Sequence, residues 1–132
     1  MNLYALLRRL PRACYAVAAL TLYLLLLWMG GQETTVAHLP GRDDFSKVYH
    51  VVFYGGWCVL VWLSMRRPSL LVAVGLTMLA GAGDEFHQSL LPFREARLSD
   101  VLLDTAAATA GALLMSALAR RTALQQKGAS CA

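Results

Sequence analysis

Charged residues are scarce in this chain. Of its 132 residues, 58% are hydrophobic and only 15% are Asp, Glu, Lys or Arg, a composition too apolar for an ordinary water-soluble domain. The net charge of +4 comes from short arginine clusters beside apolar runs, which is a membrane-topology signal and not the basic surface of a nucleic-acid-binding protein. The composition therefore indicates a membrane protein without a nucleic-acid partner.

Cysteine and the common catalytic motifs are also sparse. Cys14, Cys58 and Cys131 are an odd number of scattered thiols, so they form neither a disulfide framework nor a metal-ligand spacing. The sequence contains no serine elbow, metal-binding histidine pair or phosphate-binding loop. It also lacks a long linker or an internal repeat. We therefore predict a single domain over residues 1–132, with no cofactor and no bound metal.

Four apolar runs divide the chain, and each is close to the ~20 residues that cross a membrane core about 30 Å thick. The first follows Arg12 without a signal-peptide cleavage site, so we expect it to be retained. The predicted spans cover about residues 13–30, 48–65, 69–88 and 98–119. The sequence thus predicts an all-α protein, an integral membrane four-helix bundle.

Basic residues are distributed unevenly around these runs. One side of the predicted membrane receives most of them: Arg8, Arg9, Arg12, Arg66, Arg67, Arg120, Arg121 and Lys127. Because positive charges favour the cytoplasmic side, we predict that both termini are cytoplasmic. All acidic residues then lie at the outer face.

The stretch from Asp84 to Gly111 combines acidic, basic and amide side chains with apolar surroundings. Ionisable groups at membrane depth are tolerated when they pair, reach water or serve a function. Asp100 and Asp104 are one helical turn apart, and small residues continue their stripe to Gly111, which allows close helix packing. We therefore expect these acids to point into the bundle.

The other two polar helix faces follow from the same spacing argument. Lys47, His50 and Tyr54 share one face of the second predicted span, and Glu85 and Gln88 share a face of the third. Together the three faces predict one outward-facing polar pocket. Its predicted ligand-binding residues are Lys47, His50, Tyr54, Glu85, Gln88, Arg94, Asp100 and Asp104.

Individual roles follow from side-chain chemistry. His50 is the best candidate for a proton carrier near neutral pH, and Glu85 is the second acid or base candidate. The planar guanidinium of Arg94 suits a phosphate or carboxylate group. Ion pairs between the basic and acidic members would instead cap the bundle without any ligand. The remaining polar residues of this stretch are expected to be solvated: Asp84, His87, Glu95 and Arg97.

These spacings resemble those of the VanZ-like membrane proteins, a family named for a teicoplanin-resistance factor. The family pattern has Asp-Lys-x-x-His-x-x-x-Tyr in one helix, and then Glu-x-x-Gln followed by Arg, Asp and Asn at fixed intervals. The matching residues run from Ser46, Lys47, His50 and Tyr54 to Glu85, Gln88, Arg94, Asp100 and Asp104. Ser46 stands in place of the usual Asp, and Asp104 in place of the usual Asn.

The resemblance implies a multi-pass protein of the bacterial inner membrane, in an antibiotic-resistance-related family of the cell envelope. Two functions are consistent with the residues. The first is binding of an anionic lipid headgroup, a cell-wall lipid intermediate or a lipoglycopeptide antibiotic in the outward-facing pocket. The alternative is a membrane-embedded enzyme that acts on a lipid-linked phosphate, with His50 and Glu85 as acid and base. A small multidrug transporter is disfavoured, because no acid lies near the expected membrane midplane.

Overall fold

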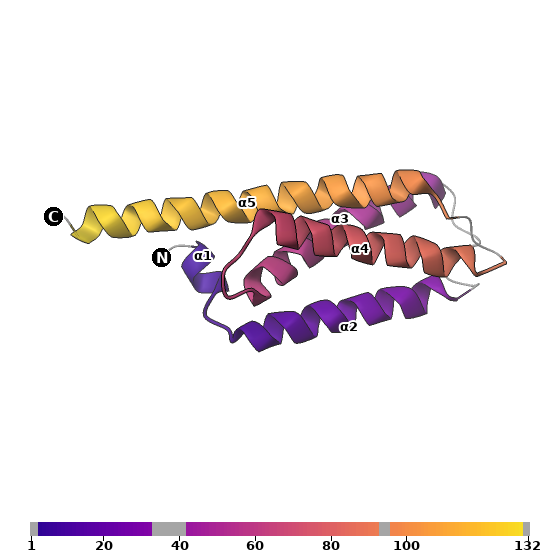
Figure 1. Ribbon diagram of the computed structural model, residues 1–132, viewed down its shortest axis with the longest axis horizontal. Helices are drawn as coiled ribbons and strands as arrows, with labels where there is room; N and C mark the ends of the chain where they lie inside the picture. Colours follow the sequence, from indigo (N-terminus) through magenta and orange to yellow (C-terminus); the bar gives the residue numbers. More distant parts are fainter. Residues whose placement is uncertain (1–2, 33–41, 93–95, 131–132) are drawn as a thin grey trace.

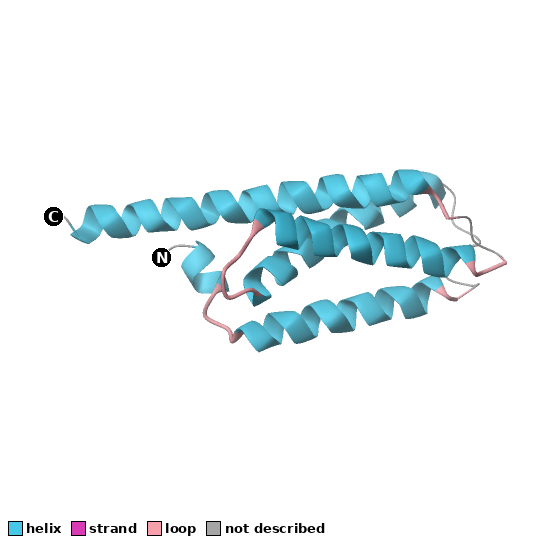
Figure 2. Cartoon of the chain, viewed as in Figure 1, coloured by secondary structure: helices cyan, strands magenta, loops and turns pink. Residues whose placement is uncertain are grey.

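The computed structural model describes residues 3–32, 42–92 and 96–130, and every regular element within them is an α-helix (Figures 1 and 2). The predicted all-α class is therefore confirmed. The helices are α1 (Leu3–Leu7), α2 (Arg12–Gly30), α3 (Arg42–Ser64), α4 (Leu70–Ser89) and α5 (Leu98–Ser130).

Two of the predicted spans correspond closely to observed helices, and two are extended. The runs 13–30 and 69–88 become α2 and α4. By contrast, α3 begins at Arg42 instead of Val48, and α5 continues through Arg120 and Arg121 to Ser130. Hydropathy indicates which residues lie within a membrane, but it does not indicate where a helix ends. Polar residues with adequate helix propensity can continue a helix outside the membrane.

Within the described residues, three helices are long and apolar enough to cross a membrane, namely α2, α4 and α5. Helix α3 is not among them, because Lys47, His50 and two glycines interrupt its apolar residues. Many large apolar side chains are exposed, among them Leu79 and Leu102, as expected where lipid replaces water. The chain is a membrane protein by these criteria, and the four-span bundle remains a prediction.

Helices α3, α4 and α5 form the centre of the molecule. Helix α5 packs along both α3 and α4, and α2 packs mainly on α3. Helix α1 and the C-terminal part of α5 lie at the same end of the molecule (Figure 1). The cytoplasmic location of that end remains a prediction.

Small residues bring α3 and α5 close together, as the stripe ending at Gly111 predicted. A Cβ atom built on Gly111 would lie only 2.8 Å from the carbonyl oxygen of Gly55. Ala108 and Ala112 are fully buried on the same face of α5. This close backbone approach fixes the position of α5 along the axis of α3. It therefore also fixes the position of Asp104 relative to His50.

Hydrogen bonds to helix carbonyls tie α2 to its neighbours. The indole N–H of Trp57 donates to the carbonyl oxygen of Ala19 over 2.7 Å. The hydroxyl of Tyr23 donates to the carbonyl oxygen of Ala80 on α4 over 3.1 Å. These contacts hold α2 against α3 and α4, with its C-terminal end beside the acidic residues of α4.

Candidate functional site

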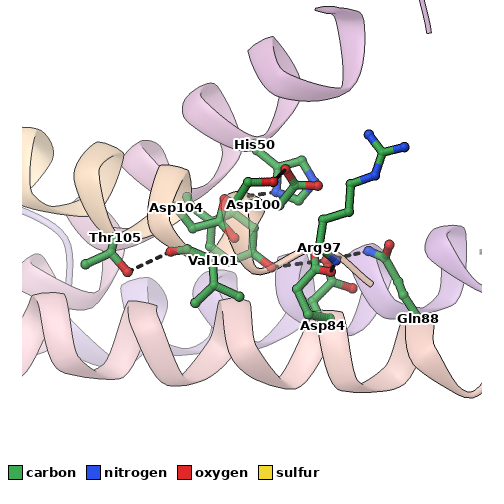
Figure 3. Close-up of polar contacts among 11 residues, drawn as sticks. His50, Asp84, Gln88, Arg97, Asp100, Val101, Asp104 and Thr105 are labelled. Atoms are coloured by element: carbon green, nitrogen blue, oxygen red, sulfur yellow. Dashed lines mark hydrogen bonds and ion pairs between the residues drawn. The ribbon is translucent and has the colours of Figure 1, made fainter. Parts of the chain in front are cut away.

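Polar side chains from α3, α4 and α5 are buried together where α3 and α5 begin and α4 ends (Figure 3). We call this group the polar cluster; it consists of His50, Tyr54, Asp84, Glu85, Gln88, Asp100 and Asp104. The side chains of its four central members, His50, Asp84, Glu85 and Asp104, are all less than one tenth exposed. The structure therefore places polar side chains of three helices together, and their joint role as a site remains a prediction.

His50 and Asp104 form the closest side-chain pair of the cluster. Nδ1 of His50 donates to Oδ1 of Asp104 over 2.9 Å. Gly81 of α4 makes room for this pair, since a Cβ atom there would lie 2.8 Å from Oδ2 of Asp104. The pairing fixes the orientation of the imidazole ring and leaves Nε2 as the nitrogen available for other chemistry.

Asp84 is a central member of the cluster, and the expectation that it is solvated was wrong. Its side chain is only 2% exposed. Oδ2 accepts hydrogen bonds from the hydroxyl of Tyr54 over 3.3 Å and from the amide of Gln88 over 3.1 Å. Because Asp84 and Glu85 are adjacent, helical spacing places them on different faces of α4. Both side chains are nevertheless buried: Asp84 contacts Tyr54 of α3, and Glu85 contacts the backbone that leads into α5. The i, i+4 spacing of Asp84 and Gln88 was the sequence signal that could have identified this residue.

Glu85 and Asp100 are each oriented by one hydrogen bond at the start of α5. Oε2 of Glu85 accepts from the backbone N–H of Arg97 over 2.6 Å. Oδ1 of Asp100 accepts from the hydroxyl of Ser99 over 3.2 Å. Figure 3 shows Asp100 and Asp104 on successive turns beside the His50 ring. Glu85 is therefore held by the backbone of the segment leading into α5.

Several carboxylate oxygens in the cluster lack a hydrogen-bond partner. Oδ1 of Asp84, Oε1 of Glu85 and Oδ2 of Asp104 are fully buried and have no partner among the described residues. Such groups are unusual in folded proteins, since an unsatisfied buried acceptor costs roughly 1–3 kcal/mol and a charged one more. The cluster therefore contains three acceptor oxygens that the described part of the chain leaves unsatisfied.

One subset of the cluster has the composition and spacing of metal ligands. Ligand atoms of His50, Glu85 and Asp100 all lie within 4.8 Å of one another. The three residues come from three different helices. This juxtaposition was not foreseen, because residues separated so widely in the chain show no metal-ligand spacing in the sequence.

The basic residues of the predicted site lie elsewhere. The Lys47 side chain is exposed, one turn before His50 on α3, and therefore lies outside the buried group. Arg94 falls outside the described residues. The Arg97 side chain is exposed, although its backbone N–H binds Glu85. The buried part of the site thus combines a histidine with acids and hydrogen-bonding groups.

A family model described as VanZ/LLP1 matches residues 15–120, a range that contains α3, α4 and most of α2 and α5. No curated protein and no solved structure matches the chain. The family match covers every residue of the polar cluster.

Proposed function

Because this chain belongs to the VanZ/LLP1 family, we propose that it is a cell-envelope membrane protein whose polar cluster binds an amphiphilic ligand. The ligand carries hydrogen-bond donors and an anionic group on its head. A phosphate-bearing lipid headgroup, a cell-wall lipid intermediate and a lipoglycopeptide antibiotic all have these properties. The cluster faces the outer side of the bacterial inner membrane in this proposal.

The unpaired acceptors of the cluster are the observation that carries the proposal. Asp84, Glu85 and Asp104 each present one buried oxygen that has no partner in the described ranges 3–32, 42–92 and 96–130. A ligand hydroxyl, amide or ammonium group would satisfy them, whereas a purely structural ion-pair cap would have paired them with Lys or Arg side chains. Among the Lys and Arg residues whose side-chain burial the structure describes, none is buried.

An amphiphile fits the surroundings of the cluster. The helices that carry it also expose apolar side chains such as Val52, Leu79 and Leu102, along which acyl chains can lie. Lys47 is exposed one turn from His50 and is available to a phosphate or carboxylate group at the membrane surface. Side-chain chemistry gives Arg94 the same role in this proposal, because its planar fork can bind two phosphate oxygens at once.

The proposal can be tested by native mass spectrometry of the full-length protein in detergent. Phosphatidylglycerol supplies both hydroxyl donors and a phosphate, phosphatidic acid lacks the added hydroxyls, and diacylglycerol lacks the phosphate. We expect preferential retention of phosphatidylglycerol, which decreases in Arg94→Ala and not in the control Arg66→Ala. Equal retention of diacylglycerol, or unchanged retention in Arg94→Ala, would count against the proposal.

A membrane-embedded enzyme is the second candidate, and the His50–Asp104 hydrogen bond favours it. In this reaction His50 Nε2 takes a proton from water, and the water oxygen bonds to phosphorus as the bond to the lipid alcohol breaks. Protonated Glu85 gives a proton to the departing alkoxide. Release of phosphate from a lipid phosphate, lost in both His50→Ala and Glu85→Gln, would support this candidate. Lack of turnover across a panel of envelope lipids would exclude it.

A further inference from the structure

We propose that His50, Glu85 and Asp100 form a binding site for a divalent cation, with Asp104 as the residue that orients His50. Each of the three ligands comes from a different helix, and their ligand atoms lie within 4.8 Å of one another. Protein ligands sit roughly 2.0–2.2 Å from zinc, so neighbouring ligand atoms around one ion are about 3–3.5 Å apart. Small side-chain movements therefore bring this set to coordination distance.

The hydrogen bonds around these residues have the arrangement found around metal ligands. A metal-binding histidine commonly donates its second ring N–H to a carboxylate, which fixes the tautomer and the ring orientation. His50 donates from Nδ1 to Asp104 over 2.9 Å, which leaves Nε2 for the cation. Glu85 is held through Oε2 by the backbone N–H of Arg97. His50 and Glu85 therefore each have a hydrogen-bond partner, which orients the atom that remains available to the cation.

An unpartnered buried oxygen gives independent support for a ligand at this position. Oε1 of Glu85 has no hydrogen-bond partner among the described residues, and the Glu85 side chain is only 6% exposed. Its neighbour Oε2 is satisfied. A cation between Glu85, Asp100 and His50 would bind to the free lone pairs of Oε1. No salt bridge within the described structure reaches that oxygen.

The charge balance of the cluster points to a cation as well. Asp84, Glu85 and Asp104 are buried and Asp100 is partly buried, while none of the Lys and Arg side chains whose burial is described is buried. Several carboxylates gathered at membrane depth repel one another unless they are protonated or bind positive charge. A divalent ion supplies that charge, and a mixed nitrogen and oxygen ligand set suits Zn²⁺, Mn²⁺ or Fe²⁺.

Three protein ligands leave coordination positions open on the ion. An anionic group of the headgroup can occupy such a position, which explains how an acid-rich cluster accepts a phosphate. This bridging step rests on the proposed function, whereas the cation site itself does not.

The test is titration of metal-stripped, full-length protein in detergent with Mn²⁺, in which electron paramagnetic resonance measures the unbound ion. Competition by Zn²⁺ gives the preference between the two metals. We expect one saturable site per chain, which is lost in Glu85→Gln and in Asp100→Asn. Asp104→Ala should weaken binding by about 10–100-fold, the effect typical of a residue that orients a metal ligand. His87→Gln is the matched control, because His87 lies on α4 two residues after Glu85 and is not part of the ligand set; binding should be unchanged.

Circular dichroism and gel filtration identify variants that remain folded. Asp100 is only partly buried, so Asp100→Asn decides the result if Glu85→Gln does not fold. Absence of saturable Mn²⁺ and Zn²⁺ binding, or equal binding by wild type and Asp100→Asn, would overturn the cation site. Retention of phosphatidylglycerol that is unaffected by chelation would overturn the bridging step. Intact cation binding without lipid retention would overturn the proposed function alone.

Discussion

The two ends of the central helices differ sharply in how their buried groups are satisfied. At one end, apolar residues of α3, α4 and α5 pack on each other, and the core includes Cys58, Leu63, Ala73, Ala112 and Met115. We call this group the apolar end. At the other end, the same helices bury the polar cluster, in which three carboxylate oxygens lack partners within the part of the chain that the structure describes.

This difference separates stability from function along one set of helices. Close packing at the apolar end stabilises the fold through dispersion contacts that need no ligand. Unpaired acceptors at the polar end cost free energy in the isolated chain and are retained where a ligand satisfies them. Substitutions at the two ends should therefore have opposite consequences for stability and for binding.

The largest expected loss of stability comes from Met115→Ala at the apolar end. Met115 is fully buried, and removal of a buried methionine side chain typically costs about 2–5 kcal/mol. Chemical unfolding in mixed micelles measures this loss. Retention of phosphatidylglycerol by the folded fraction should be unchanged, and a loss of retention here would break the separation between the two ends.

Gly111→Ala should cost about 1–3 kcal/mol, the range typical of overpacking. The new Cβ would lie 2.8 Å from the backbone oxygen of Gly55, so α3 and α5 must move apart. Gly56→Ala is the matched control on α3, since no atom lies within 4 Å of its built Cβ. The same unfolding measurement on both variants checks the prediction; equal stability would contradict the close approach of the two helices.

His50 and Asp104 should be energetically coupled. Removal of either partner leaves the other buried without its hydrogen bond, so the single substitutions to Ala should be non-additive by about 0.5–3 kcal/mol. A double-mutant cycle with His50→Ala and Asp104→Ala measures this coupling. Additive effects would mean that the observed 2.9 Å contact contributes nothing to the fold.

Asp84→Asn should have the smallest effect on stability and a clear effect on function. The substitution keeps one carbonyl oxygen for Tyr54 and Gln88 and removes a buried charge. Stability should therefore stay within about 1 kcal/mol of wild type or increase. Retention of phosphatidylglycerol should fall. A marked loss of stability would instead assign Asp84 a structural role.

Much of the fold was predictable because membrane helices have simple periodicities. The limits of α2 and α4 followed from their apolar runs, and the burial of Asp104 followed from the small residues after it on α5. The ends of α3 and α5 did not, because helices continue into polar surroundings where hydropathy carries no information. Helix α1 was missed because it has only five residues.

The sequence predicted which helix faces carry the candidate site, but it did not predict which side chains bind each other. Spacing identified His50, Glu85 and Asp104 as inward-facing residues. It could not show that Asp104 binds His50 or that Glu85 binds the backbone of Arg97. Those contacts depend on how far each of the three helices is shifted along its axis relative to the others. The prediction also misplaced Asp84: the i, i+4 spacing of Asp84 and Gln88 was a signal in the sequence, but the burial of their helix face depends on how the helices pack.

The most direct test compares lipid retention in Glu85→Gln and Met115→Ala by native mass spectrometry. The account predicts that Glu85→Gln is as stable as wild type and loses phosphatidylglycerol, whereas Met115→Ala is less stable and retains it. Equal retention of phosphatidylglycerol by both variants would contradict the assignment of the polar cluster as the ligand site.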